Sequence, residues 1–343
     1  MKHNVIGIDL AKEIFQVCVL NTQNTVLSNK SVKRARLEHT VRQYSPQTHV
    51  IAMEACATAH YWGQVFQDMG FEVSLLPAQH VKAFTRGQKN DAQDALAICE
   101  AAQRPAIHCV PVKNKTQQEI KSLRAIRKRW VKQRTALSNQ IRGLCAEFGV
   151  HFTIGLRPLR KGLVDLFDGA NRAIPVKLFR YLRVLYEELC GLDEQIKGID
   201  KDIQEVCQTN PLFKVLQSIP GCGPLIAAAC LSEMGSGQQF QSGRQFSAFV
   251  GLVPRQHSSG GKACLLGLSK NGDRELRTLF IHGARAVFRF CRKKDTALSH
   301  WLNALILRRG KNRAIVALAN KLARICWAVL TTGKAFEMSK AFA

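Results

Sequence analysis

The first hundred residues alternate short apolar runs with amphipathic stretches, and this alternation restricts the fold more than any other feature of the chain. Short apolar runs between polar residues are typical of buried strands, whereas apolar residues three and four apart are typical of helices. The expected strands are residues 5–8, 15–20, 25–28, 49–53 and 72–76, and the expected helices are 57–69 and 92–102. The chain therefore begins with an α/β unit.

Four carboxylates lie at the ends of these elements. Asp9 ends the first strand and Glu54 ends the fourth, while Asp91 and Asp94 begin the last helix. A spacing of three residues puts Asp91 and Asp94 on one helical face. Carboxylates at the ends of apolar strands are costly to bury unless a cation neutralises them. Oxygen donors of this kind suit Mg²⁺, and two such ions roughly 3.5–4 Å apart can activate a nucleophile in phosphoryl transfer.

Each of these acids also has a simpler interpretation. Asp9 alone would be read as a turn or capping residue, and Glu54 could pair with a lysine. Asp91 and Asp94 could simply begin a helix, where acids suit the helix dipole. However, three strands followed by strand, helix, strand and helix is the order of the RNase H-like fold. The four acids in that order favour a metal-dependent catalytic site made of all four.

A long helix is expected from residue 113 to about 148. Leu123, Trp130, Leu137 and Leu144 recur every seven residues, which is typical of an amphipathic or coiled-coil helix. A second helical stretch at 176–207 could return antiparallel to it. The interval 149–175 is expected to be irregular, because prolines interrupt it.

The charge of the chain indicates its partner. The sequence of 343 residues holds 50 Lys and Arg against 25 Asp and Glu, a net charge of +25. Such a charge calls for a polyanion, and nucleic acid is the usual one because Lys and Arg displace its condensed counterions. An anionic membrane is the alternative. No uninterrupted apolar stretch is long enough to span a bilayer, since residues 314–330 include Asn320, Lys321 and Arg324.

The long helix carries much of this charge. Between residues 113 and 148 the only acids are Glu119 and Glu147. A solvated helix face usually mixes both signs, so charge of one sign favours a nucleic-acid contact. The candidate residues are Lys121, Arg124, Arg127, Lys128, Arg129, Lys132 and Arg134.

The N-terminus shows no export signal, since Met1-Lys2-His3 leads directly into the first strand. Twelve cysteines occur singly with no Cys-x-x-Cys pair, so neither a zinc site nor a disulfide framework is indicated. We expect reduced thiols in a cytoplasmic protein.

The C-terminal part, from about residue 210, offers two further candidate sites. Residues 218–228 resemble a helix-hairpin-helix turn, in which Gly221 and Gly223 would let backbone amides approach a phosphate. A tight turn between packed helices explains the same residues equally well. Downstream, a glycine-rich loop holds Ser258-Ser259-Gly260-Gly261. A serine there is usually a turn residue, but the loop is also a plausible anion site because of the basic residues nearby, Arg255, Lys262, Lys270, Arg274 and Arg277.

The chain resembles the IS-one-ten family of insertion-sequence transposases, whose relatives include pilin-gene invertases. The resemblance covers almost the whole chain. It rests on Gly7-Ile8-Asp9, Met53-Glu54 and Asp91-Ala92-Gln93-Asp94-Ala95 in the N-terminal part. In the C-terminal part it rests on Ile219-Pro220-Gly221, Gly251-Leu252-Val253-Pro254, Ser259-Gly260 and Ser269-Lys270-Asn271-Gly272-Asp273.

The resemblance implies a RuvC-like domain in which Asp9, Glu54, Asp91 and Asp94 hold Mg²⁺. It also implies that Ser259, or the adjacent Ser258, attacks a DNA phosphate and forms a phosphoserine link. Members of the family look like homo-oligomers, dimers or tetramers, whose domains complete one site across protomers with a structured guide RNA. It further implies a bacterial protein associated with the nucleoid.

The sequence thus predicts three parts. Residues 1–112 form an RNase H/RuvC-like α/β domain, 113–209 a helical coiled-coil linker, and 210–343 a mostly helical transposase domain. The expected function is cutting and rejoining of DNA strands during transposition. Two alternatives remain open: a Holliday-junction resolvase or nuclease that uses water as nucleophile, and a nucleic-acid-binding protein without activity.

Overall fold

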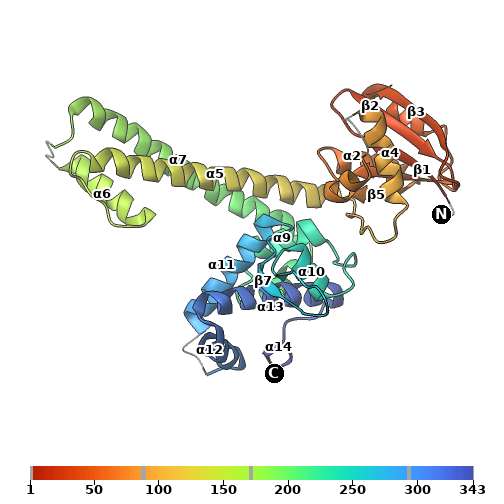
Figure 1. The fold of residues 1–343 in the computed structure, drawn as a ribbon. Coiled ribbons are helices and arrows are strands. Elements are labelled where there is room, and N and C mark those ends of the chain that lie inside the picture. The colour runs from red at the N-terminus through yellow and green to blue at the C-terminus, as the bar shows by residue number, and fades with distance from the viewer. Residues whose placement is uncertain (1–2, 86–89, 170–172, 292–294, 343) are drawn as a thin grey trace. The chain divides into compact units, whose positions relative to one another are not determined.

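The computed structural model describes residues 3–85, 90–169, 173–291 and 295–342 (Figure 1). Its contacts divide the chain into two compact units, Met1–Lys115 and Thr116–Ala343.

The N-terminal unit is built on a five-stranded sheet with the order β3-β2-β1-β4-β5. β1 (Asn4–Asp9), β2 (Ile14–Leu20) and β3 (Val26–Lys33) are antiparallel neighbours. β4 (His49–Glu54) and β5 (Glu72–Leu76) run parallel to β1. The helices of the unit are α1 (Leu37–Val41), α2 (Ala59–Asp68), α3 (Ala78–Val81) and α4 (Asp91–Ala102), with 3-10 turns at Arg34–Arg36 and Lys82–Phe84. The predicted order of strands and helices is confirmed.

Alternation along the strands gives the sheet two buried faces. Ile6, Ile8 and Phe15 belong to one core, which also includes Trp62 and Phe66 of α2. The neighbouring residues belong to the other core: Val5, Cys18, Leu20, Ala52 and Leu76 pack with Ala95, Ile98 and Cys99 of α4. Because successive side chains point to opposite faces, Gly7, Asp9 and Glu54 lie on the face that α4 covers.

The second unit begins with two long antiparallel helices, α5 (Lys115–Ala146) and α7 (Val176–Gln208). They lie side by side in Figure 1. Arg127 pairs with Asp200 and Arg134 with Asp193. The residue numbers rise along α5 and fall along α7, as in an antiparallel pair. The seven-residue repeat forms the seam: Leu123 packs on the C-terminal core, Leu137 and Leu144 on the distal core, and Trp130 on both.

The expectation that residues 149–175 are irregular is wrong. They contain α6 (Leu156–Asp168), whose Leu159, Leu163 and Leu166 are buried against α5 and α7. Pro158 is the third residue of α6, in the first turn, where backbone N–H groups have no intrahelical acceptor. This proline therefore breaks no hydrogen bond.

The rest of the unit is a helical assembly with one small hairpin. Its helices are α8 (Leu212–Gln217), α9 (Pro224–Met234), α10 (Gly243–Phe249), α11 (Arg274–Cys291), α12 (Ala297–Arg309), α13 (Lys311–Thr332) and α14 (Met338–Phe342). The hairpin consists of β6 (Pro254–Gln256) and β7 (Leu265–Leu268). Ile120 of α5 and Ile199 and Ile203 of α7 belong to the same core as these helices. The proximal ends of the long helices are thus continuous with the C-terminal assembly.

Helix α13 is the central helix of that core, where Leu318, Leu322 and Cys326 are almost fully buried. Within the described residues, it is the one helix long and apolar enough to cross a membrane by length and composition. Half of its most apolar window is buried inside the unit, as is usual for a core helix.

Candidate functional site

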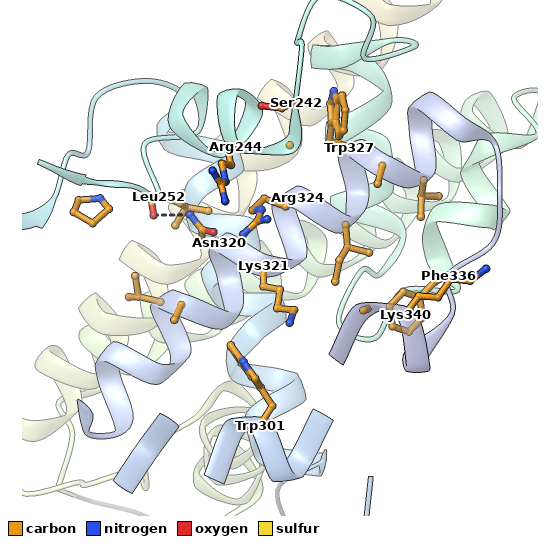
Figure 2. Close-up of a pocket in the computed structure, with 18 of the residues that line it drawn as sticks. Ser242, Arg244, Leu252, Trp301, Asn320, Lys321, Arg324, Trp327, Phe336 and Lys340 are labelled. Atoms are coloured by element: carbon orange, nitrogen blue, oxygen red, sulfur yellow. Dashed lines mark hydrogen bonds between the residues drawn. The ribbon is translucent and has the colours of Figure 1, made fainter. Parts of the chain in front are cut away.

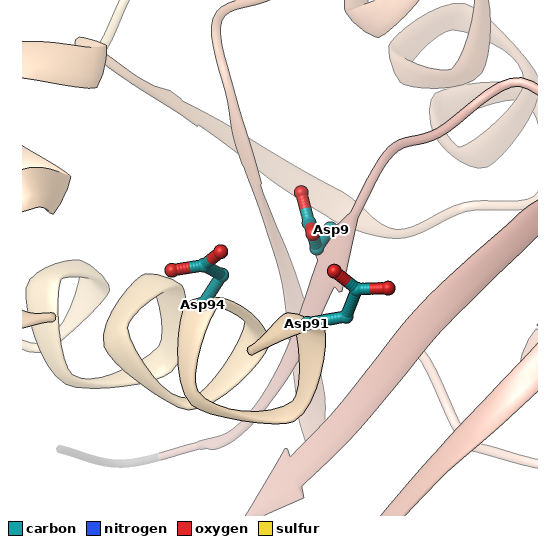
Figure 3. A group of neighbouring side chains, drawn as sticks. All are labelled: Asp9, Asp91 and Asp94. Atoms are coloured by element: carbon teal, nitrogen blue, oxygen red, sulfur yellow. The ribbon is translucent and has the colours of Figure 1, made fainter. Parts of the chain in front are cut away.

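Three of the four predicted acids converge. The carboxylate oxygens of Asp9, Asp91 and Asp94 lie within 4.8 Å of one another, with Asp9 and Asp94 partly buried and Asp91 exposed (Figure 3). Asp9 comes from the end of β1, whereas Asp91 and Asp94 come from the first turn of α4. Three carboxylates this close repel one another unless a cation lies between them. The cluster is therefore a candidate metal centre.

A glycine lets α4 come this close to β1. A Cβ atom on Gly7 would lie 2.4 Å from Cys99 Sγ and 2.7 Å from the carbonyl oxygen of Ala95, closer than real contacts allow. Gly7 precedes Asp9 by two residues on the same face of the sheet. The lack of a side chain there brings the first turn of α4, with both of its acids, next to Asp9.

Two asparagines fix the start of α4. The side chain of Asn90 caps the helix by accepting a hydrogen bond from the backbone N–H of Ala92 at 2.9 Å. Asn29 Nδ2 on β3 donates to the carbonyl oxygen of Ala92, also at 2.9 Å. Asp91 and Asp94 do begin a helix, as the simpler interpretation proposes, and they also face Asp9. The sequence interpretation missed Gly7 and both asparagines, although an Asn directly before an acidic first turn is a recognisable capping signal.

Glu54 lies next to this cluster but is not part of the close group. Its strand is parallel to β1 with Met53 opposite Ile8, so Glu54 ends β4 beside the point where Asp9 ends β1. The Cys56 thiol lies near both acids. Burial raises its pKa, and the negative charges of Glu54 and Asp9 raise that pKa further. Glu54 and Asp9 therefore both lie close to Cys56, at the ends of neighbouring strands.

The donor set fits a divalent cation. Mg²⁺ binds oxygen at about 2.1 Å, so two of its ligands lie at most about 4.2 Å apart. Neighbouring ligands of an octahedral ion lie only about 3.0 Å apart, so the three aspartates would need to close by up to about 2 Å to share one ion. Their hard carboxylate oxygens suit Mg²⁺, whereas zinc prefers nitrogen and sulfur ligands.

The basic residues of α5 do not form one free surface. Arg124 is buried, with 5% of its side chain exposed, and donates to Ser232 and to Glu275 at 2.7 and 2.6 Å. Arg127 pairs with Asp200 and Arg134 with Asp193. Lys121 and Lys128 lie 3.9 and 3.5 Å from Glu233 and Glu275 and are largely exposed.

Arg129 and Lys132 differ from those five. Both are exposed, and neither has an ion pair within the described part of the chain. The solvated face of α5 that remains for a polyanion thus centres on these two residues. Arg124, Arg127 and Arg134 instead hold α5 against α7, α9 and α11.

The two glycines of the predicted phosphate-binding turn have different surroundings. Gly221 has a φ of +83°, and a Cβ there would lie 2.6 Å from Val287 Cγ2 and 2.8 Å from the carbonyl oxygen of Gly283. Gly221 is therefore required for packing the turn on α11. Gly223 is exposed at the N-terminus of α9 with nothing within 4 Å of its Cβ position. Of the two, only Gly223 leaves room for a ligand.

The two candidate serines lie at the tip of the β6–β7 hairpin. Gly260 and Gly261 both have positive φ, as a two-residue hairpin turn of type I′ requires, and the Lys262 N–H donates to the Ser259 carbonyl at 3.0 Å. Ser258 Oγ accepts hydrogen bonds from Gln256 Nε2 at 2.9 Å and from the Cys264 N–H at 3.2 Å. The Ser259 side chain is exposed, and the structure gives its hydroxyl no hydrogen bond to another described residue.

The base of this hairpin is braced by the other C-terminal motifs. A Cβ on Gly272 would lie 1.9 Å from the carbonyl oxygen of Phe249, so the segments around Gly251 and Gly272 are in direct backbone contact. Arg277 donates to the Val250 carbonyl at 2.9 Å, and Asp273 caps α11 through Oδ1. The remaining predicted anion-binding residues, Arg255, Lys262, Lys270 and Arg274, are all exposed.

Comparisons with known proteins identify the family of the chain. Residues 6–148 match a transposase family model of the DEDD type, and residues 213–299 match the model of the transposase IS116/IS110/IS902 family. A probable family 20 transposase of Pseudomonas aeruginosa is 44% identical over 95% of this chain and 96% of its own length. The transposase for an insertion sequence element of Coxiella burnetii is 43% identical over 97% and 91%.

A more distant relative is a gene-inverting protein. The pilin gene-inverting protein of Moraxella bovis is 24% identical over 98% of both chains. The matches with the two transposases of Pseudomonas aeruginosa and Coxiella burnetii extend over nearly the full length of this chain. The chain therefore belongs to the IS110 family of transposases.

Proposed function

We propose that this transposase cuts and rejoins DNA strands through a metal-dependent reaction in which Ser259 is the nucleophile. One observation carries the proposal: the carboxylates of Asp9, Asp91 and Asp94 converge at the end of β1. Glu54 is the last residue of the neighbouring strand β4. The strand order β3-β2-β1-β4-β5, with β2 antiparallel to its neighbours, supports an RNase H/RuvC-like assignment for this unit.

Asp9, Glu54, Asp91 and Asp94 would hold Mg²⁺. The ion would supply positive charge to a DNA phosphate and lower the barrier to attack on its phosphorus. The protein's own part is to position the carboxylates, and the packing of α4 on Gly7 does so. Asn90 and Asn29 keep the first turn of α4 in place.

Ser259 would form the covalent link. Its oxygen attacks phosphorus, the bond from phosphorus to one DNA oxygen breaks, and the serine loses a proton while the departing DNA oxygen gains one. Rejoining reverses these changes when a DNA hydroxyl attacks the phosphoserine. The number of phosphoester bonds is unchanged throughout, so no external energy source is needed.

Both serines are exposed, and Ser259 is favoured over Ser258 because its hydroxyl has no hydrogen bond to another described residue. Ser258 already accepts two hydrogen bonds that close the hairpin. A serine whose hydroxyl holds its own loop together is less free to approach a phosphate than one that points into solvent.

The test is formation of a covalent adduct with DNA that carries the element's ends, in the presence of Mg²⁺ and a candidate guide RNA. Ser259→Ala should form no adduct and bind DNA normally, whereas Ser258→Ala should retain some adduct. An adduct with Ser259→Ala would refute the serine assignment. Metal-dependent cutting without any adduct would favour a resolvase-like reaction with water.

We further propose a homo-oligomer that acts on DNA in the bacterial cytoplasm with a guide RNA. The exposed Arg129 and Lys132 of α5 and the exposed Gly223 end of α9 remain available to nucleic acid, as do the exposed cations around the β6–β7 hairpin, Arg255, Lys262, Lys270 and Arg274. If protomers complete each other's sites, mixing Ser259→Ala protein with Asp9→Asn protein should partly restore the adduct. No rescue at any mixing ratio would favour a site within one chain.

A further inference from the structure

The C-terminal assembly holds a large groove that the proposed reaction does not use. It has a volume of about 1490 Å³ and is lined by residues of α10, β7, α12, α13 and the segment that leads to α14 (Figure 2). Small-molecule sites are usually about 300–1,000 Å³. The groove therefore exceeds what a single metabolite needs and suits a segment of a polymer.

One face of α13 gives the groove its charge. Arg313, Lys321 and Arg324 recur at helical spacing on the face opposite the buried Leu318 and Leu322. Arg244 on α10 and Lys334 beyond α13 add to them. None of these five has an ion pair with a described acid, and the one acid in the lining, Glu337, pairs with Lys340. The groove thus carries a net positive charge that nothing in the described structure balances.

Lys321 is held in place inside this groove. Its Nζ lies 5.0 Å from the ring centre of Trp301 and 4.4 Å from that of Phe342. Burial and the nearby Arg324 lower the pKa of Lys321, which reflects the cost of its charge there without an anion. An anion bound beside it would relieve that cost.

The walls between these cations are apolar. Leu252, Leu266, Val316 and Ile325 line the groove together with Trp301 and Trp327. Asn320 fixes one wall by donating to the Leu252 carbonyl at 3.1 Å and to Ser247 Oγ at 3.2 Å. A duplex hides its base faces in the stack and cannot lay them on these apolar walls. A single strand offers phosphates to cations and bases to apolar and aromatic surface.

We propose that this groove binds a single-stranded segment of DNA and leads it to the hairpin that carries Ser259. Pro254 and Leu268 line the groove at the base of the hairpin, and Ser259 follows Pro254 by five residues. The tip thus lies at most about 18 Å along the chain from the groove wall. The identification of the ligand as DNA rests on the proposed function. The positive charge and the apolar walls of the groove are observed independently of it.

The experiment measures the binding of a fluorescein-labelled twelve-nucleotide oligo(dT) to the full chain by anisotropy, in EDTA and at several salt concentrations. Replacing Lys321 and Arg324 together by Gln should weaken binding at least tenfold. It should also reduce the log–log salt slope by about 1.4, that is about 0.7 for each of two phosphate contacts. The matched control is Arg157→Gln with Lys161→Gln, which removes the same charges from exposed positions on α6.

A second pair of variants keeps the test independent of the aromatic contacts of Lys321. Arg244→Gln with Arg313→Gln changes two exposed side chains for which the structure shows no ion pair, and it should give a loss of the same kind with an unchanged melting temperature. The proposal is overturned if both pairs bind oligo(dT) like the unmodified chain, or if the control pair loses as much.

Other classes of ligand are separate outcomes. The proposal also fails if the groove variants lose binding to oligo(U), to vesicles of phosphatidylglycerol or to poly-glutamate while keeping their affinity for oligo(dT). Because EDTA prevents cutting, the result does not depend on the adduct assay. A chain that binds oligo(dT) through the groove yet forms no adduct would refute the serine mechanism and leave the groove assignment intact.

Discussion

Replacing Gly7 by alanine should damage the candidate metal centre without touching any of its carboxylates. The new Cβ would lie 2.7 Å from the carbonyl oxygen of Ala95 and 2.4 Å from Cys99 Sγ. An ordinary contact needs about 3.4 Å, so the backbone of α4 must retreat by roughly 0.7 Å. Overpacking of this kind costs about 1–3 kcal/mol.

The retreat would move Asp91 and Asp94 away from Asp9, because both belong to the first turn of α4, which leads directly into Ala95. A displacement of 1 Å in a catalytic arrangement can cost about 100-fold in rate. We therefore expect strand cleavage to fall by about 10- to 100-fold. Binding of Mn²⁺, measured by water-proton relaxation, should weaken. The free energy of opening α4 should fall by the same 1–3 kcal/mol. Native-state hydrogen exchange at its amides should therefore be about 5- to 150-fold faster.

Two controls isolate the cause. Gly198→Ala in α7 places a methyl group where nothing lies within 4 Å, and it should stabilise by about 0.5–1 kcal/mol and leave cleavage unchanged. Adding Cys99→Ala to Gly7→Ala removes the sulfur contact but not the carbonyl contact, so it should not restore cleavage. Wild-type exchange at α4 together with wild-type Mn²⁺ affinity in Gly7→Ala would refute the reasoning.

Three further changes test the remaining assignments. Arg124→Met leaves Glu233, which is 10% exposed, without its buried partner, and should lower the free energy of unfolding by about 3–5 kcal/mol in urea titrations; a loss below 1 kcal/mol would contradict a structural role. Arg129→Gln with Lys132→Gln should reduce the log–log salt slope of duplex DNA binding by about 1.8, and an unchanged slope would mean that this face is merely solvated. Gly221→Ala should lower the melting temperature while the salt slope stays unchanged, because the space beside Gly221 is filled by α11; a reduced slope at normal stability would instead indicate a phosphate contact.

The elements of the N-terminal unit follow from the sequence because their signal is local. Both faces of the sheet are buried, so β1 has apolar residues on each face: Val5 on one, and Ile6 and Ile8 on the other. The position of Asp9 and Glu54 at neighbouring strand ends could be anticipated for the same reason. The close approach of α4 to β1 could not be anticipated. It depends on the lack of a side chain at Gly7, which leaves room for a backbone carbonyl about ninety residues later in the chain.

The charge on α5 shows why a one-signed helix face is ambiguous. The partners of Arg127, Arg134 and Arg124 lie 73, 59 and 151 residues away in the chain, on α7 and α11. Periodicity places these arginines on a helix but does not reveal which faces another element will cover. An excess of one charge on a helix can mean a polyanion or an acidic neighbour. Here these three arginines have acidic neighbours, while Arg129 and Lys132 have no ion pair among the described residues.

The serine pair is a case in which local geometry separates what the sequence leaves equivalent. Gly260 and Gly261 supply the two positive φ angles of a tight hairpin turn, and this fixes the register of the residues on each side. Ser258 Oγ accepts from the Cys264 N–H across the turn and from Gln256 Nε2 on its own side, so it belongs to the hydrogen bonds that close the hairpin. Ser259 is also exposed, but its hydroxyl has no hydrogen bond to another described residue. A phosphate that approaches the hairpin from solvent can therefore contact the Ser259 hydroxyl without breaking a bond that closes the turn.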